Sequence, residues 1–567
     1  MEKAGSGELR VISGSGRFRW AVCLLPVLTA ALPLYAAQSG EVGSAACAAC
    51  HGEIYRSYMR TPMAITSGRA GSGSFPEKFD QGDFYHQPSG ARYHVYRERG
   101  NDYFSFQIAD PQGRLHGTRQ LDYYIGSGAV ARSYLTRVDG YLYEAPVSYY
   151  SISGKWAPSP GYEQYKYIYL TRTIGLSCLQ CHASQPQWIA GTQNGFRDPP
   201  FLENGVACER CHGPGAAHIA KMKSGQIGGS PEIVNPAKLD SGRRDSVCDQ
   251  CHLTGEARIA SAGRDIESFR PGDQLSDYVS VFVRAGETRG MKVNSHAQKL
   301  AQSACKRASG DRLWCGTCHD PHRTPAPSER VAWYREKCLG CHNTRSCTES
   351  AKARQVAGDN CIGCHMPRNL VLDVEHVVYT DHSIPRRPAR ATAPPAGDYS
   401  LVLFGGGQAS PRDLGLAYAE LALRLKNSVF QSRALELLLK AQGENPNDVP
   451  VMVELAGIYN RTSQKAKADA LYEKILRADP TQVTASVTLG ASLVERGDLM
   501  AGIKLWQDAL SRNPGLELTR MNLALMQIRT GDVKGAEANL VKAVEINPGL
   551  AVAHDLLAKL RSATPAK

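Results

Sequence analysis

Seven copies of one cysteine and histidine pattern are the residues of this sequence best suited to chemistry. Each copy reads Cys-x-x-Cys-His, and together the copies use most of the 17 cysteines and seven of the 16 histidines. Numbered in chain order as units 1 to 7, the copies contain Cys47 and Cys50, Cys178 and Cys181, Cys208 and Cys211, Cys248 and Cys251, Cys315 and Cys318, Cys338 and Cys341, and Cys361 and Cys364. Their histidines are His51, His182, His212, His252, His319, His342 and His365. This pattern is the attachment signature of c-type haem.

The spacing within each unit has a physical reason. Two cysteines three positions apart in a helical turn lie on the same side, where each can form a thioether with one vinyl group of a porphyrin. The adjacent histidine then points at the iron as its proximal ligand. A zinc site built from Cys-x-x-Cys pairs requires no histidine fixed behind each second cysteine. The sequence therefore predicts seven covalently bound haem c groups with their iron.

The histidines outside the units decide which chemistry these haems support. An iron with two protein ligands transfers electrons, whereas an iron with an open position can bind and convert a small substrate. Nine further histidines are present, and without His554, which falls among C-terminal repeats, eight remain for seven irons. Four of them are expected to be distal ligands: His218, His296, His322 and His382. His322 follows His319 too closely to reach the opposite face of the same haem, so it would bind a neighbouring iron.

Unit 1 has a different candidate ligand in Met63. Met59 and Met63 both follow His51 within a short stretch of chain. A methionine thioether on the iron would raise the potential of this haem above that of its neighbours. Methionine also packs readily in apolar cores, so ordinary packing is the alternative. We prefer Met63 as a ligand.

Two cysteines outside the units, Cys305 and Cys347, have two possible states. In an exported protein they can form a disulfide that closes a loop around unit 5. They can equally be two unrelated buried thiols, because sequence does not show whether their Cα atoms lie close enough to be bridged.

Size and composition limit the classes of protein to consider. The chain of 567 residues is too long for one hydrophobic core and suits two to four domains. With 42% hydrophobic and 21% charged residues, most of it is expected to fold. The net charge of +12 includes no Lys/Arg block, which argues against nucleic-acid binding. A second long apolar run is missing, which excludes a polytopic membrane protein.

The N-terminal residues 1–37 predict a signal peptide. Arg10, Arg17 and Arg19 precede an apolar stretch from Trp20 to about Ala37, and small residues lead into a polar segment. An uncleaved membrane anchor is the alternative, but the stretch is short and contains two prolines. We therefore expect export to the periplasm or another extracytoplasmic compartment, with Cys23 removed together with the signal.

Residues 38–385 are expected to form a heptahaem domain with a β-rich insert at about residues 75–170. The insert region holds 15 of the 25 tyrosines, and apolar residues alternate in 92–96 and 104–108 around a turn-forming segment, 99–102. The tyrosines could form a contact surface or assist electron transfer, but we favour a role in the β-core. Residues 171–385 show little periodicity, so the porphyrins must supply much of their core, against short helices and irregular connections.

The C-terminal part follows a different pattern. After a Pro- and Ala-rich linker at 386–400, an Asn-Pro or Asp-Pro pair recurs every 34 residues, at Asn445, Asp479, Asn513 and Asn547. This is the tetratricopeptide period. Residues 401–567 are therefore expected to form an α-solenoid of four repeats with a capping helix from about Ala551. Such a solenoid binds a protein partner or has a purely structural role, and we favour partner binding.

These motifs resemble those of exported multihaem c-type cytochromes, a superfamily that includes tetrahaem electron carriers and octahaem hydroxylamine oxidoreductases. The resemblance is carried by the seven units and by Cys-His-Gly-Pro-Gly at 211–215, Cys-His-Asp-Pro-His at 318–322 and Cys-His-Met-Pro at 364–367. It implies that His218 and His322 bind neighbouring haems. Met63 stands where relatives often place a ligand histidine. The implied fold is mainly α: a haem-packed domain with a β-rich insert, followed by a tetratricopeptide solenoid.

The predicted function is electron transfer through the haems, with the solenoid docking a redox partner protein and a possible membrane-associated donor or acceptor. One alternative is a haem oxidoreductase that converts a small nitrogen or sulfur compound at an open iron site. The sequence leaves open whether the protein is an enzyme, and we favour an electron carrier. In another alternative, the repeats carry the main function and the haems form a structural or sensing module.

Overall fold

The computed structural model describes residues 40–72, 77–225, 232–286, 290–343, 347–387 and 399–563. These residues belong to one structural unit that begins at Gly40. The predicted signal peptide, residues 1–37 with Cys23, lies outside the described residues, as does most of the predicted linker 386–400. Within the described ranges, no helix has both the length and the apolar composition that a membrane span requires.

A four-stranded antiparallel sheet begins the insert. Its strands, in spatial order, are β2 (Asp83–His86), β3 (Ala91–Glu98), β4 (Asn101–Ile108) and β5 (His116–Leu121). The hairpin predicted from the two alternating segments is confirmed, because β3 pairs with β4 over its whole length. Arg99 and Gly100 at its turn both have positive φ, which Gly100 adopts without steric cost. Alternate residues such as Val95 and Phe104 are fully buried.

The second sheet of the insert contains its most deeply buried strand. Its strands are β1 (Ser67–Arg69), β6 (Tyr123–Ile125), β7 (Ala131–Val138), β8 (Tyr141–Tyr150) and β10 (Arg172–Thr173), in this spatial order, with β9 (Lys155–Pro158) also paired to β8. All residues of β8 except the first are buried. The strand packs into two apolar clusters, with Val147 and Tyr149 in one and Leu142 in the other. Tyr143, Tyr149 and Tyr150 of β8 are therefore core residues, whereas Tyr141 is half-buried.

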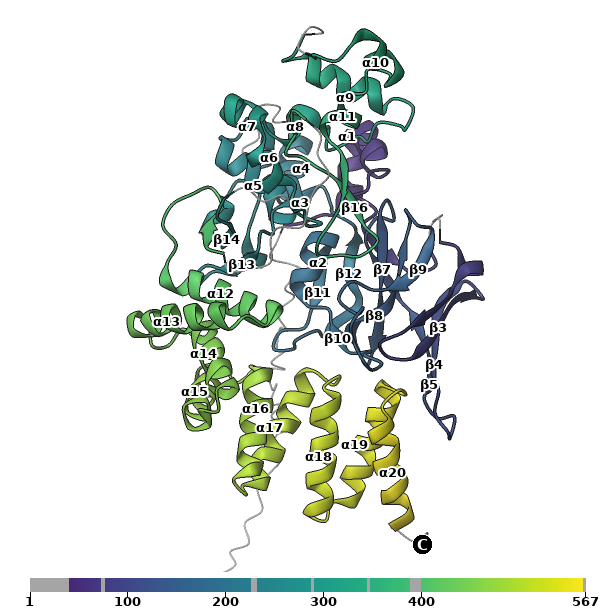
Figure 1. The fold of residues 1–567 in the computed structure, drawn as a ribbon, viewed down its shortest axis with the longest axis vertical. Helices are drawn as coiled ribbons and strands as arrows, with labels where there is room; N and C mark the ends of the chain where they lie inside the picture. Colours follow the sequence, from purple (N-terminus) through teal and green to yellow (C-terminus); the bar gives the residue numbers. More distant parts are fainter. Residues whose placement is uncertain are drawn as a thin grey trace, which may run out of the picture. The chain divides into compact units, whose positions relative to one another are not determined.

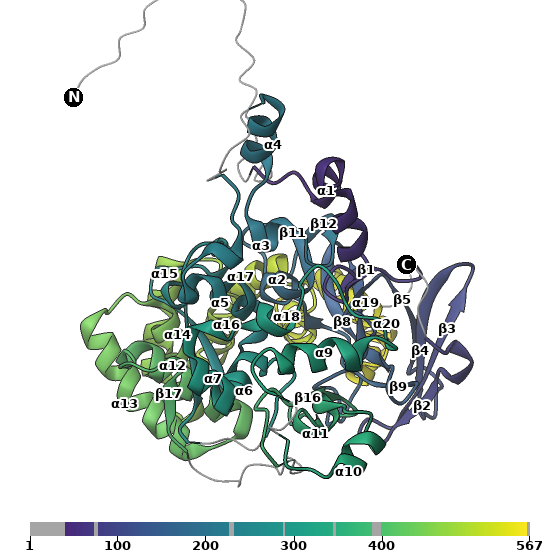
Figure 2. The same ribbon diagram turned by 90° about the horizontal axis from the view of Figure 1, so that it is seen from above.

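Short helices carry the units. In order of units 1 to 7 they are α1 (Ser44–Tyr58), α2 (Leu176–His182), α3 (Glu209–His212), α5 (Ser241–His252), α8 (Cys315–Cys318), α9 (Arg330–Leu339) and α11 (Cys361–His365). The other helices of this segment are α4 (Ala216–Lys223), α6 (His296–Gln302), α7 (Ala304–Ser309) and α10 (Ala351–Val356). Figure 2 shows α9, α10 and α11 as short coils joined by loops. No residue of α8, α9 or α11 is buried.

Three small antiparallel sheets separate the units, so the expectation of a mainly α chain is only partly right. They pair β11 (Ala183–Trp188) with β12 (Phe196–Asn204), β13 (Ala257–Ala260) with β14 (Val279–Arg284) and β17 (Leu401–Leu403), and β15 (Arg368–Leu370) with β16 (Val378–Thr380). Isolated 3₁₀ turns lie at Phe79–Gln81, Pro236–Lys238, Ile266–Ser268, Leu275–Asp277 and Gly310–Arg312. The apolar residues Val279, Val281 and Phe282, all buried, favour a strand here. Sequence analysis missed this signal because it followed the cysteine spacing in this part of the chain.

The C-terminal part is a series of antiparallel helix pairs, drawn in green to yellow in Figure 1. They are α12 (Pro411–Leu425) and α13 (Ser428–Glu444), α14 (Val449–Arg461) and α15 (Lys465–Ala478), α16 (Val483–Glu495) and α17 (Leu499–Arg512), α18 (Glu517–Arg529) and α19 (Val533–Ile546), followed by α20 (Ala551–Ala563). The four predicted repeats and the capping helix are confirmed. A Cβ on Gly502 would lie 2.7 Å from the Gly490 carbonyl oxygen, so the crossing of α16 and α17 requires these glycines.

The solenoid is attached to the rest of the chain at both of its ends. At its start, β17 pairs with β14, a strand of the segment that carries units 2 to 7 (residues 171–387, the unit-bearing segment). Residues 401–403 therefore belong to that segment, and the predicted start of the repeats at 401 is too early. Further along, the Asn547 amide donates to the Ile168 carbonyl at 3.0 Å, and the Tyr141 hydroxyl donates to the Ser511 carbonyl at 2.8 Å. Sequence analysis missed these contacts, because an Asn-Pro corner predicts a turn but does not show which residues the turn contacts.

Candidate haem-binding site

Local sequence explains why the units form helical turns. Asp240 accepts a hydrogen bond from the Arg243 amide at the start of α5, and Asn360 accepts one from the Gly363 amide at the start of α11. Such caps satisfy backbone donors that have no partner inside the helix. The two cysteines of a unit then lie one turn apart on one side of the helix. All 14 are unpaired thiols.

Residues between the paired cysteines connect different units. The Arg210 guanidinium of unit 3 donates to the Gln180 carbonyl of unit 2 at 3.1 Å and to the Gln250 amide oxygen of unit 4 at 3.0 Å. The buried Glu209 carboxylate accepts the amides of Val42 and Gly43, both at 2.9 Å, just before unit 1. Sequence analysis missed these residues, because the variable positions of the motif carry no signal for attachment.

Thiols of different units also lie close to one another. In four pairs one thiol shifts the pKa of the other: Cys47 and Cys208, Cys181 and Cys251, Cys248 and Cys315, and Cys338 and Cys361. Burial and the neighbouring Cys208 raise the pKa of Cys47 to about 11. Cys211 lies close enough to Cys248 and Cys251 to raise the pKa of each, and Cys341 acts in the same way on Cys318. These neighbouring thiols join all seven units into one connected set.

Unit 3 has a second imidazole facing its histidine. The rings of His212 and His322 are nearly parallel, with their centres 5.9 Å apart and an interplanar angle of 9°. One metal ion held between two imidazoles keeps the ring centres about 6 Å apart, because each metal–nitrogen bond is about 2 Å. The spacing therefore fits two axial ligands on opposite faces of one haem. His322 stands beside unit 3 and not its own unit 5, as its position in the sequence predicts.

Units 4 and 5 share a cluster of four histidines. The ring centres of His252 and His296 lie 5.2 Å apart, those of His319 and His382 lie 6.2 Å apart, and His296 and His382 lie between the two unit histidines at 4.9 Å from each other. Burial lowers the pKa of His296 to about 3 and that of His319 to about 4. A neutral imidazole keeps a lone pair, which is the form that binds a metal.

Several unit histidines are oriented by a hydrogen bond at Nδ1. His212 Nδ1 lies 2.7 Å from the Val234 carbonyl oxygen, and His365 Nδ1 lies 3.0 Å from the Pro385 carbonyl oxygen. The distal candidate His382 has the same arrangement, with its Nδ1 at 2.9 Å from the Thr380 carbonyl oxygen. Such a bond makes Nδ1 the protonated nitrogen and leaves Nε2 as the metal-binding atom.

None of the ring contacts described above joins a unit histidine to the two remaining distal candidates, His218 and Met63. His218 lies on α4, six residues after His212. Met63 lies in the turn after α1, where its carbonyl accepts the Val206 amide at 3.0 Å. Their roles as ligands stay predictions.

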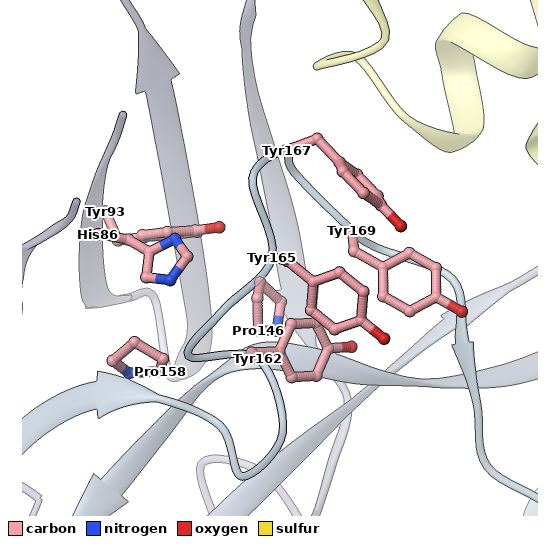
Figure 3. A pocket seen from close by; sticks show the side chains of 8 residues that line it. All are labelled: His86, Tyr93, Pro146, Pro158, Tyr162, Tyr165, Tyr167 and Tyr169. Atoms are coloured by element: carbon pink, nitrogen blue, oxygen red, sulfur yellow. The ribbon is translucent and has the colours of Figure 1, made fainter. Parts of the chain in front are cut away.

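Histidines in the insert have other partners. Both ring nitrogens of His86 are hydrogen-bonded, Nδ1 to the Ser89 hydroxyl at 2.7 Å and Nε2 to the Glu163 carbonyl at 3.1 Å. His86 also lines the pocket of Figure 3, whose other residues are Tyr93, Pro146, Pro158, Tyr162, Tyr165, Tyr167 and Tyr169. This cavity of about 10 Å³ holds one water molecule at most. The tyrosine rings fill it, so it is no substrate site.

The possible disulfide is absent from the structure. Cys305 lies on α7 and is half-buried, Cys347 is exposed, and both are free thiols. Cys305 and Cys347 are therefore two unrelated thiols, the second of the two states given above. Cys347 differs from that prediction in being exposed.

The donor set fits covalently bound haem. Each unit offers two free thiols and one imidazole, and opposed imidazoles occur at the spacing that one iron requires. In the described ranges, no group of three or more His, Cys, Asp or Glu side chains is arranged to hold a bare metal ion. A porphyrin supplies the four equatorial ligands that the protein does not.

Comparison with known families agrees with this chemistry. A family model described as the doubled CXXCH motif matches residues 307–347, and one described as cytochrome c554 and c-prime matches residues 162–213. These two segments of the chain are therefore similar to parts of multihaem c-type cytochromes. The chain's Cys-x-x-Cys-His motifs indicate covalently bound haem c with iron.

Solved structures match the chain only in part. The crystal structure of MamA has 20% identity and a TM-score of 0.23, covering 25% of this chain and 82% of that one. YrrB, a TPR protein with an unusual peptide-binding site, has 20% identity and a TM-score of 0.24, covering 26% of this chain and 77% of its own. No curated protein matches.

Proposed function

We propose that this protein is an exported electron carrier with seven covalently bound haem c groups. The observation that carries the proposal is the set of neighbouring thiols, which links all seven units. Each thioether sulfur would be attached to a porphyrin edge, so neighbouring sulfurs would bring porphyrin edges close together. Short separations between edges are what electron transfer through a protein requires.

The neighbouring thiols define an order that differs from the order in sequence. Unit 1 approaches unit 3 through Cys47 and Cys208, and unit 3 approaches unit 4 through Cys211. Unit 4 approaches both unit 2 and unit 5, and units 5, 6 and 7 follow one another. The proposed route therefore runs 1–3–4–5–6–7, with unit 2 as a branch at unit 4.

Three irons would have two imidazole ligands. His322 would complete unit 3 and His382 unit 5, on the ring spacings described above. His296, whose ring lies 5.2 Å from that of His252 at an angle of 87°, would complete unit 4 after turning toward the iron. The bound haem supplies reversible one-electron chemistry, and two strong axial ligands leave its iron no open position for a substrate. The protein contributes ligands, burial and spacing.

Unit 2 favours a second candidate function, conversion of a small nitrogen or sulfur compound. His182 is deeply buried, and burial lowers its pKa to about 4. Across the part of the chain that the structure describes, no second imidazole ring contacts His182. An iron held there by one imidazole would offer an open position in a protected site.

The solenoid is proposed to dock a redox partner. Its last two corners already bind the insert, so a partner needs another surface. On α18, Leu518, Leu525 and Ile528 are exposed, with 68% of Leu518 accessible. Exposed apolar side chains at this spacing lie on one face of a helix and suit a protein contact. The donor or acceptor could itself be bound to a membrane.

Two measurements on the full chain, matured in a host that ligates haem c, test the electron-carrier proposal. Intact mass is expected to show seven added tetrapyrroles, and the bare polypeptide mass would overturn the proposal. Electron paramagnetic resonance of the oxidised protein is expected to show low-spin signals from units 3, 4 and 5. A high-spin signal that changes on adding nitrite or hydroxylamine would instead support an enzyme with an open iron site at one of the units without a second imidazole, such as unit 2.

A matched pair of variants tests docking. Leu518→Asp with Leu525→Asp is expected to slow electron exchange with a partner, and Val356→Asp on the unit-bearing segment serves as a control at an exposed apolar residue. Equal rates in both variants and in the unmodified protein would remove the docking role.

A further inference from the structure

We propose that the hydroxyl groups of Thr66 and Tyr334 are positioning groups that, as weak acceptors, set the redox potentials of the haems at units 2 and 5 above those of haems whose histidines donate to carbonyl oxygens. Each acts through the Nδ1 atom of the unit histidine. This inference rests on the proposed function, since it requires that Nε2 of each histidine binds haem iron.

The geometry is the same at both sites. Thr66 Oγ1 lies 3.0 Å from His182 Nδ1, and the Tyr334 hydroxyl oxygen lies 3.2 Å from His319 Nδ1. Both separations are hydrogen-bond distances. When Nε2 binds a metal, Nδ1 carries the proton, so the imidazole donates and the hydroxyl oxygen accepts. His319 therefore has a side-chain acceptor, and His182 has one in addition to a hydrogen bond with the Thr66 backbone.

Units 3 and 7 differ in the type of acceptor. His212 and His365 donate to backbone carbonyl oxygens, those of Val234 and Pro385. A peptide carbonyl oxygen carries more negative charge than a hydroxyl oxygen, because resonance moves electron density onto it. A stronger acceptor makes the imidazole more basic and the metal site more electron-rich. Ferric iron is then stabilised, and the potential falls.

Both hydroxyls are held in place by structure that is remote from the histidine in sequence. Thr66 is 9% exposed, and its carbonyl accepts the Gly126 amide at 2.8 Å next to the pairing of β1 with β6. Tyr334 lies on α9, the helix that carries unit 6, with its ring 5.6 Å from that of His319 at an angle of 70°. Unit 6 thus supplies the acceptor for unit 5.

The consequence is an uneven potential along the proposed route. Units 2 and 5 would hold electrons more readily than units 3 and 7. Unit 2 is the branch and unit 5 lies near the middle of the route. Of these four haems, the two whose histidines donate to hydroxyl groups would therefore be the more readily reduced.

The test is a redox titration of the fully haem-loaded chain, followed by electron paramagnetic resonance. Tyr334→Phe and Thr66→Val each remove one acceptor without changing the shape of the side chain much. Each is expected to change the ferric–ferrous equilibrium of one haem about tenfold toward ferrous, equivalent to about 59 mV for one electron. The other haems should keep their potentials. Thr66→Ser, which keeps a hydroxyl, should restore the original potential.

Tyr141→Phe is the control for loss of a tyrosine hydroxyl, since Tyr141 is also half-buried and bonds only the Ser511 carbonyl in the solenoid. Potentials in Tyr334→Phe equal to those in Tyr141→Phe would overturn the proposal, as would equal shifts in Thr66→Val and Thr66→Ser. If Thr66→Val does not fold, the Tyr334 variant decides alone. A chain without bound tetrapyrrole would refute the proposed function, whereas a loaded chain with unshifted potentials refutes only this inference.

Discussion

The solenoid and the unit-bearing segment are both helical, but they are stabilised differently. In the solenoid, Leu455, Ala456 and Tyr472 are at most 2% exposed, and each helix packs on its neighbours. In the unit-bearing segment, the helices of units 5, 6 and 7 bury no residue at all. Helices of four to ten residues are too short to be stable alone. The comparison shows that the solenoid has its own core, while the helices of units 5, 6 and 7 require a core from their porphyrins.

The largest expected effect comes from withholding haem. A chain made in a host that cannot attach haem c should leave residues 315–365 unfolded, because their helices have no apolar core. The solenoid, residues 411–563, should stay folded. Hydrogen exchange followed by mass spectrometry should show exchange within seconds in the first range and protection in the second. Protection of both ranges would mean that the two regions do not differ as described.

The next largest effect is expected from replacing one tryptophan in each region by alanine. Trp506 is 3% exposed, and its indole nitrogen donates to the Val487 carbonyl at 3.0 Å. Trp506→Ala should destabilise α16 and α17 by about 3–5 kcal/mol, because it leaves a cavity in a packed core. Trp333→Ala on α9 should have no measurable cost in the protein without haem, because α9 has no buried residue and is expected to be unfolded there. The opening free energy of amide exchange in each helix measures both effects.

A third test changes the pH, because a carboxyl group buried in the insert has a raised pKa. Burial raises the pKa of Glu144 to about 7, although the Arg172 guanidinium lies 3.0 Å away. The folded chain then binds a proton that the unfolded chain releases near pH 4.5, so stability should fall as pH rises from about 4.5 to about 7. The loss is up to about 3 kcal/mol.

Glu144→Gln should remove this part of the pH dependence. Thermal unfolding between pH 4.5 and 7 measures it. An unchanged slope in the variant would show that Glu144 is ionised in the folded chain throughout this range.

The smallest effect separates two asparagines that occupy the same position in different repeats. Asn547 is fully buried and donates to the Ile168 carbonyl and to Glu517. Asn547→Ala should cost about 1–2 kcal/mol, because it leaves buried acceptors without donors. Asn445 is exposed, and its side-chain oxygen accepts the Asn447 amide, so Asn445→Ala should cost less. Equal losses in denaturant unfolding would mean that the contact with the insert contributes nothing measurable.

Features with a short repeat or a local pattern were predictable. The 34-residue spacing of the Asn-Pro corners gave the four helix pairs, and the alternation in 92–96 and 104–108 gave the hairpin of β3 and β4. The strands β11 to β16 were missed, because they lie among and just after residues dominated by the attachment motif. The corner contacts of Asn513 and Asn547 were missed for a different reason: their partners are more than 300 residues away in the chain.

The amino-acid sequence alone determined the chemistry of the units, because a cysteine pair and its histidine act within one helical turn. Only the tertiary structure decided which units lie next to each other and which imidazoles face each other. His322 shows the division: its sequence excludes its own unit, but only folding brings it to 5.9 Å from His212. Such pairings depend on contacts between distant segments, through residues such as Glu209 and Arg210 whose positions in the motif accept any side chain.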